Sequence, residues 1–202
     1  LASLENLKFR YEIVLQPSQY TWPIFIVIFS FFFLKEKITI RNIIAVILGF
    51  LGVFVVLTKG NLEAVNLNNL STDFIVLFAA SVFGLFSVLS KKADFEPFSA
   101  TTLFFLSATL FSFITMLLFS HFATPSKNEL IPILSNGIFI NGFSYIFWLK
   151  GLSYAKASFV APFVFTTPIF AAILIILFFQ EAFLPVYFFG LILVIFAGLV
   201  SK

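Results

Sequence analysis

Two prolines inside apolar segments are the first residues of this sequence with a chemical consequence. Pro23 lies in Thr-Trp-Pro-Ile-Phe and Pro168 in Thr-Thr-Pro-Ile-Phe, about 145 positions apart, which indicates an internal repeat. A proline within a helix has no N–H group to donate, so a backbone carbonyl is freed. In an apolar environment that carbonyl can face a cavity. We therefore expect each proline to line a cavity or to act as a hinge, and a kink without function is the alternative.

Other polar side chains within the apolar segments are few, and these too are expected to be placed for a reason. Asn141 lies one helical turn before Tyr145, and its favoured role is packing against a neighbouring helix, with substrate contact as the alternative. Trp148 lies beside Lys150, which favours an anchor at the membrane interface. The candidate substrate-binding residues are Tyr20, Trp22, Pro23, Ser87, Asn141, Tyr145, Thr167 and Pro168.

The sequence gives no pattern typical of an enzyme or a metal protein. It has no cysteine and one histidine, His121, which has no acidic cluster beside it. There is also no paired carboxylate, no Ser/His/Asp set and no Gly-rich phosphate loop. We expect no enzymatic activity, no metal and no cofactor. Acidic residues are absent from the middle of the apolar segments, so the coupling ion is not predicted.

Composition predicts an all-α, multi-pass membrane protein. The sequence is 61% hydrophobic and 10% charged, with a mean hydropathy of +1.11, whereas a soluble domain has about 25% charged residues. Its charges gather between apolar runs of the length that crosses a bilayer. We predict seven transmembrane helices: Trp22–Leu34 (reaching back to about Val14), Ile43–Leu57, Phe74–Leu89, Phe98–Phe119, Ile131–Leu149, Ser158–Phe179 and Phe183–Val200. Most of the basic residues behind the net charge of +3 lie at the ends of the apolar segments, so this charge does not indicate a nucleic-acid partner.

Loop charges predict the orientation of these helices. The first, third and fifth connections and the C-terminus carry eight basic residues: Lys35, Lys37, Arg41, Lys91, Lys92, Lys150, Lys156 and Lys202. The intervening loops carry Lys59 and Lys127. Because basic residues favour the cytoplasmic side, the first set and the C-terminus are expected there, in a bacterial inner (plasma) membrane.

The repeated helices are predicted to point in opposite directions. Each copy is followed at the same distance by a glutamate, but Glu36 lies between two lysines and Glu181 lies between Gln180 and Ala182. Five spans separate one copy from the next, and a unit with an odd number of spans inverts when duplicated. We therefore expect a ten-helix fold of two inverted five-helix repeats. Residues 1–60 would hold the last two helices of the first repeat, and residues 72–202 the complete second repeat.

These segments resemble the EamA repeat of the drug/metabolite transporter superfamily. The first copy runs from Pro23 through Leu34-Lys35-Glu36-Lys37-Ile38-Thr39 and is followed by Gly49 and Gly52. The second copy consists of Leu152 to Ser158 and Pro168 to Glu181 and is followed by Gly190 and Gly198. Gln19 to Pro23, Leu85 to Lys92 and Phe147 to Leu152 are also similar to the aromatic amino-acid exporter branch, although Phe86 and Thr21 depart from its pattern. The resemblance implies a carrier with a central cavity between its repeats. It also implies that the first three helices are missing, so that this sequence is truncated at its N-terminus.

The function expected is a secondary transporter that exports small metabolites, amino acids among them, by alternating access between the repeats. Its partners would be a small-molecule substrate and the lipid bilayer, and the sequence indicates no oligomeric state. A truncated membrane protein without transport activity is the serious alternative. A seven-helix photoreceptor is disfavoured because Phe183–Val200 has no lysine for a retinal Schiff base, and an intramembrane enzyme lacks a catalytic set.

Overall fold

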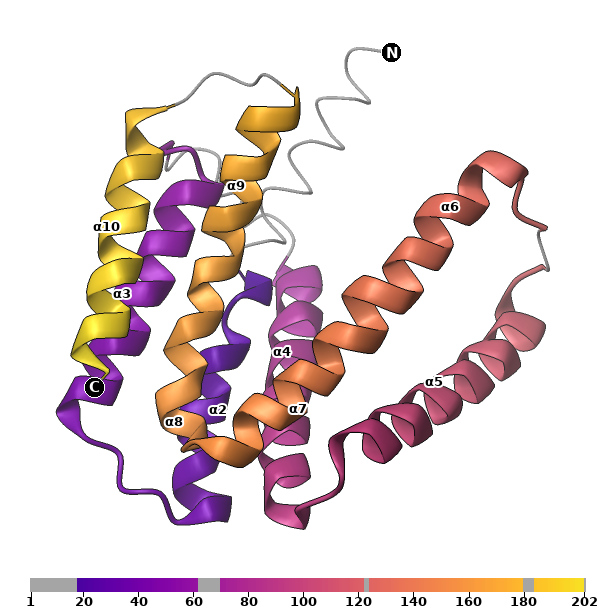
Figure 1. Ribbon diagram of the computed structural model, residues 1–202, viewed down its shortest axis with the longest axis horizontal. Coiled ribbons are helices and arrows are strands. Elements are labelled where there is room, and N and C mark those ends of the chain that lie inside the picture. The colour runs from indigo at the N-terminus through magenta and orange to yellow at the C-terminus, as the bar shows by residue number, and fades with distance from the viewer. Residues whose placement is uncertain (1–17, 62–69, 122–123, 180–183, 202) are drawn as a thin grey trace. The chain divides into compact units, whose positions relative to one another are not determined.

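The computed structural model describes residues 18–61, 70–121, 124–179 and 184–201 (Figure 1). These residues form seven helical segments and no strand, which confirms the predicted all-helical architecture. The segments are α2 (Trp22–Leu34), α3 (Ile40–Leu57), α4 (Leu70–Ala93), α5 (Pro97–Phe119), α6 to α7 (Lys127–Tyr154), α8 to α9 (Ala157–Phe179) and α10 (Pro185–Val200). Five of them are long and apolar enough to span a membrane, whereas α2 and α10 are shorter apolar helices.

Side-chain caps define where two of the helices begin. Thr39 and Asn42 form a capping box at the start of α3, because the Thr39 N–H donates to Asn42 Oδ1 at 3.0 Å. Glu96 caps α5 by accepting from the amides of Phe98 and Ser99, at 2.9 and 2.6 Å. Pro97 then occupies the first turn, where a missing N–H has no cost. Hydropathy alone would make Glu96 a solvated loop charge, and it would miss this capping role.

Two of the long segments are interrupted by turns of a different helical type. The first consists of α6 (Lys127–Ser135), a π-helical segment η2 (Asn136–Phe143) and α7 (Ser144–Tyr154). The second consists of α8 (Ala157–Val160), a 3₁₀ segment η3 (Ala161–Phe165) and α9 (Thr166–Phe179). Short 3₁₀ and π stretches within helices mark strain or functional positions more often than regular turns do.

The chain divides into two compact units that do not follow the sequence repeats. Unit 1 comprises Leu1–Lys92 and Ala155–Lys202, and unit 2 comprises Ala93–Tyr154. Unit 1 therefore joins helices from both predicted repeats. Within unit 1, α3 and α10 lie side by side and run antiparallel (Figure 1).

Two glycines bring α3 and α10 close together. A methyl group added at Gly52 would lie 2.8 Å from the carbonyl oxygen of Gly190, and one added at Gly190 would lie 2.9 Å from that of Gly52. At the spacing of the repeat, Ala197 and Ala45 correspond to Gly52 and Gly190, and both alanines are fully buried. Small residues at these four positions let the helix backbones pack tightly, as they do in membrane helix pairs.

Unit 2 packs α5 against α7. The ring of Phe105 meets that of Tyr145 edge-on, with their centroids 5.2 Å apart. The large apolar side chains Leu118 and Phe119 at the end of α5 and Ile131 in α6 are exposed. Such a surface is typical of a helix in contact with lipid rather than water.

Candidate functional site

The repeated prolines lie in the interior of unit 1. Pro23 and Pro162 are fully buried, and Pro168 is buried at the start of α9. Pro23 lies in the first turn of α2, after the turn at Tyr20 and Thr21. Pro168 has no N–H to donate to the carbonyl four residues earlier, and Pro162 lies in the 3₁₀ segment η3. Helical irregularity in the second copy therefore coincides with its two prolines.

A threonine two residues before each repeated proline makes the same hydrogen bond in both copies. Thr21 Oγ1 donates to the Ser18 carbonyl oxygen at 2.7 Å, and Thr166 Oγ1 donates to that of Phe163 at 2.6 Å. The two bonds connect corresponding positions of the repeat. A side-chain donor of this kind satisfies a carbonyl near a proline kink, which allows the kink to persist in an apolar setting.

Trp22 and Ser87 both contact Phe83 of α4, Trp22 through the Phe83 ring and Ser87 through the Phe83 backbone carbonyl. Trp22 of α2 meets Phe83 of α4 edge-on at a centroid distance of 4.8 Å. Ser87 lies one turn after Phe83, is fully buried and donates its hydroxyl to the Phe83 carbonyl at 3.0 Å. The two helices can approach because Gly84 lacks a side chain, since a methyl group there would lie 2.7 Å from Phe25 Cβ.

The remaining candidates of unit 1 differ in exposure. Tyr20 is half-buried just before α2, and Thr167 is exposed in the first turn of α9. Its neighbour Thr166, which we had not selected, makes the hydrogen bond near the proline. The signal that could have identified Thr166 is its correspondence with Thr21 in the repeat.

The two candidates of unit 2 lie in and just after the π-helical segment. Asn141 Nδ2 donates to the carbonyl and side-chain oxygens of Asn136, five residues earlier. The sequence favours packing of Asn141 against a neighbouring helix, and the hydrogen bond observed lies instead within its own segment. Tyr145 follows in α7 and contacts Phe105.

Glu36 joins the two copies of the proline helix, a role that sequence reasoning missed. Its carboxylate accepts hydrogen bonds from the amides of Ala157 and Ser158, at 2.8 and 3.0 Å, and from the Ser158 hydroxyl at 2.6 Å. These groups begin α8, so the glutamate after α2 caps the segment that contains the other repeat. The available signal was the glutamate that recurs after both prolines.

Several predicted features lie outside the described residues, namely Leu1 to Pro17, Gln180, Glu181, Ala182 and Lys202. Within the described part of the chain, no three His, Asp or Glu side chains form a group that could hold a metal ion.

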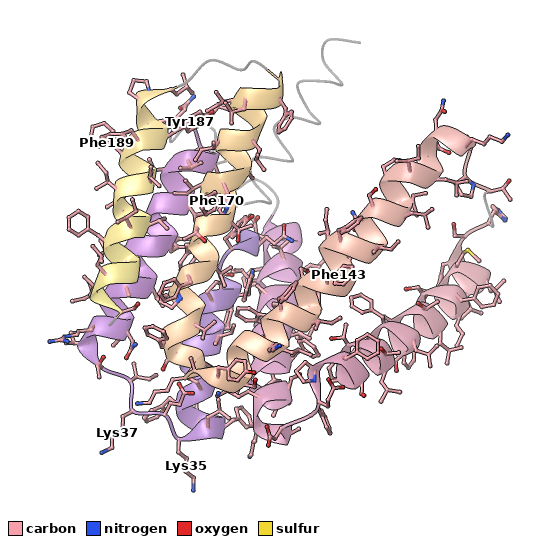
Figure 2. All side chains as sticks on the ribbon, viewed as in Figure 1. Lys35, Lys37, Phe143, Phe170, Tyr187 and Phe189 are labelled. Atoms are coloured by element: carbon pink, nitrogen blue, oxygen red, sulfur yellow. The ribbon has the colours of Figure 1, made fainter. Side chains whose placement is uncertain are left out.

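Basic residues gather at one end of unit 1. Lys91 Nζ donates to the Ala155 carbonyl at 2.7 Å, next to the Glu36 cap at Ala157. Lys35 and Lys37 project from the loop at this end, and Tyr187 lies at the opposite end of the unit (Figure 2). One end rich in basic residues is the arrangement expected of helices that cross a membrane.

Comparison with known proteins identifies the family. The sequence profile of the EamA-like transporter family matches residues 13–58 and 70–201. A solved crystal structure superposes on 97% of this chain and 68% of its own with a TM-score of 0.84 at 19% identity, a likeness that concerns the fold alone.

Three curated relatives are all named uncharacterized transporters. One from Archaeoglobus fulgidus is 27% identical over 69% of this chain, and YyaM from Bacillus subtilis is 26% identical over 75%. One from Clostridium kluyveri is 25% identical over 90%. The matches span 50%, 52% and 60% of those relatives, so the chain corresponds to about half of their length. Together with its apolar helices, this similarity indicates an integral membrane protein of the transporter type. The chain belongs to the EamA-like transporter family.

Proposed function

We propose that this chain forms part of a secondary transporter that moves small metabolites across the membrane by alternating access between two inverted repeats. The observation that carries the proposal is the pair of matched hydrogen bonds at Thr21 and Thr166. Both lie beside a proline of the same sequence repeat. A carrier of this type needs helices that are interrupted in corresponding places of its two halves.

The directions of the copies in unit 1 support an inverted repeat. Glu36, which follows α2, contacts the first residues of α8, so α2 and the segment from α8 to α9 run antiparallel (Figure 1). The next helices of each copy, α3 and α10, are antiparallel as well. Since five spans separate the copies, we propose that the complete carrier has ten helices in two five-helix repeats.

The proline turns are the proposed hinges. The Gly52–Gly190 crossing leaves no room between α3 and α10, and this packing favours a fixed contact there. Pro168, by contrast, follows the 3₁₀ segment η3 inside a longer helical segment, and its missing N–H makes that segment easier to bend. Pro23 lies in the first turn of α2, directly after the turn at Tyr20 and Thr21, so the bend proposed for the first copy lies in that turn. We propose that substrate binds beside these turns, at Tyr20, Trp22, Pro23, Ser87, Thr167 and Pro168. Asn141 and Tyr145 are proposed separately as substrate-contacting residues of unit 2.

Amino acids are the proposed substrate class, exported toward the side opposite the basic end of unit 1. The resemblance of Gln19 to Pro23 to the aromatic amino-acid exporter branch supports this choice. So does the aromatic pair Trp22 and Phe83 beside the first proline, because apolar rings suit an aromatic or aliphatic side chain. The basic end and the C-terminus would then lie in the cytoplasm of a bacterial cell.

Transport by the full-length protein in proteoliposomes tests the proposal. We expect labelled amino acids to be carried, and we expect Pro168→Ala to reduce the rate at least about tenfold while the protein stays folded. Pro185→Ala is the matched control, since Pro185 occupies the first turn of α10, where a proline is tolerated. Equal rates for the native protein and Pro168→Ala would contradict the hinge. No movement of any amino acid would favour the alternative, a membrane protein without amino-acid transport.

A further inference from the structure

A cationic cavity opens at the basic end of unit 1. Its volume is about 470 Å³. Its walls come from the loop after α2, the start of α3, the start of α8 and the residue after α10. The lining residues are Lys37, Thr39, Ile40, Arg41, Asn42, Lys156, Ser158, Phe159 and Ser201.

The charges around the cavity are strongly unbalanced. Lys37, Arg41 and Lys156 all contribute to its walls, and no acidic side chain does. All three are exposed. Glu36 lies behind the wall, where its carboxylate accepts from the Ser158 hydroxyl at 2.6 Å. The cavity therefore presents three positive charges against one negative charge that is already hydrogen-bonded.

Uncharged polar side chains that can donate hydrogen bonds, such as Asn42, also line the cavity. Asn42 is buried, and its Oδ1 accepts from both the N–H and the hydroxyl of Thr39, so Nδ2 is the atom of that amide able to donate to an anion. Several donors and three cations around a cavity match a group with multiple acceptor oxygens and negative charge, such as a phosphate. A carboxylate offers fewer oxygens for so many donors.

The apolar rim distinguishes a lipid from a soluble phosphate. Ile40 lines the cavity and is 69% exposed, and Ile43 and Ile44 continue the exposed apolar surface along α3. A soluble phosphate has no apolar group that could pack against this rim, whereas the acyl chains of a phospholipid would cover it. Basic pockets at the ends of membrane helices are suited to anionic headgroups.

We propose that this cavity binds the phosphate of an anionic phospholipid, with Lys37, Arg41 and Lys156 as its charged contacts and Ile40 against the acyl chains. The site does not depend on the transported substrate. The bound lipid would link the loop after α2 to the start of α8 and the end of α10. It would thus stabilise the end of unit 1 at which Glu36 joins the two copies.

The test follows the thermal midpoint of the purified protein in neutral detergent during titration with short-chain phosphatidylglycerol, phosphatidylcholine or inorganic phosphate. We expect phosphatidylglycerol to raise the midpoint at the lowest concentration. The triple variant Lys37→Gln/Arg41→Gln/Lys156→Gln should require about 100-fold more lipid, because each basic residue near a membrane surface contributes about fivefold. The control Lys35→Gln/Lys92→Gln/Lys150→Gln removes the same charge at residues that do not line the cavity, and it should behave like the native protein.

Each outcome bears on the proposal. An undiminished response of the triple variant to phosphatidylglycerol would overturn it, as would equal responses to phosphatidylcholine. A full shift with inorganic phosphate alone would assign the cavity to a soluble anion instead. If the triple variant does not fold, the single variants Lys37→Gln and Lys35→Gln provide the comparison. Of these two lysines, Lys37 lines the cavity and Lys35 does not. About fivefold weaker lipid binding is therefore expected for Lys37→Gln, and unchanged binding for Lys35→Gln.

Discussion

The Glu36 carboxylate accepts a hydrogen bond from the Ser158 hydroxyl at 2.6 Å, although 122 positions separate the two residues. The same carboxylate accepts from the amides of Ala157 and Ser158. It thereby satisfies N–H groups that begin α8 and have no partner within that helix. Since Glu36 follows one copy of the proline helix and Ser158 begins the segment holding the other, this contact fixes the C-terminal end of the first copy beside the start of the second.

Replacing Glu36 should destabilise unit 1 more than replacing Ser158. Glu36→Ala removes all three hydrogen bonds, and we expect a loss of roughly 1.5–3 kcal/mol in the free energy of unfolding, as for bonds to a charged group. Ser158→Ala removes one bond and should cost about 1 kcal/mol. The thermal midpoints of the two purified variants test whether Glu36→Ala is the less stable of the two. Equal stability of Glu36→Ala and the native protein would contradict the role of the cap.

The α3–α10 crossing should tolerate no added carbon at Gly52. A methyl group there meets the Gly190 carbonyl at 2.8 Å and Val194 Cγ2 at 2.8 Å, so the helices must separate. We expect Gly52→Ala to lower the free energy of unfolding by about 1–3 kcal/mol, the usual cost of overpacking. Gly151→Ala is the control, because its added methyl group meets nothing within 4 Å apart from its chain neighbours and the backbone of its own helix. Matching thermal midpoints for the two variants would refute the tight crossing.

Helix positions were predictable here because apolar runs and charged ends dominate the sequence. The predicted Trp22–Leu34 has the observed bounds of α2, and the predicted Phe98–Phe119 differs from α5 by one residue. The starts of α3 and α4 were placed too late, since polar first turns such as Thr39 to Asn42 carry no apolar signal. Helix ends of this kind depend on caps, and hydropathy does not detect them.

The details of the candidate site were less predictable, because they depend on contacts between distant residues. The repeat identified Pro23 and Pro168, but the change of helical type at Ala161–Phe165 depends on local backbone geometry. Glu36 had been regarded as a charge at a helix end, since its partners lie in another part of the sequence. Whether Asn141 bonds its own segment or a neighbour likewise depends on the π-helical turn around it.

The cap at Glu96 should make the start of α5 sensitive to acid. The amides of Ser99 and Phe98 hold the pKa of the Glu96 carboxyl below its ordinary value of 4.5. A lowered pKa means that the cap stabilises α5 above pH 4.5 and is lost as the pH falls through the lowered value. Hydrogen exchange at Ser99 should therefore accelerate at acidic pH, once corrected for the intrinsic rate. In Glu96→Gln the protection of the Ser99 amide should be weaker at neutral pH and should change little as the pH falls. If the variant kept the same pH dependence as the native protein, the cap would be excluded as the cause.

The π-helical turn should depend on the bond between Asn141 and Asn136. Its i to i−5 spacing fits the π-helical turn, and Asn141→Leu removes the side-chain donor. We expect the segment to shift toward a regular α-helix, which rotates the following residues and separates Tyr145 from Phe105. Because the chain has no cysteine, a Phe105→Cys/Tyr145→Cys pair can report this contact by cross-linking. The yield should fall several-fold with Asn141→Leu and stay constant with Asn128→Leu, which changes an asparagine outside the π-helical turn. Equal yields in the two backgrounds would mean that the turn persists without the Asn141 amide.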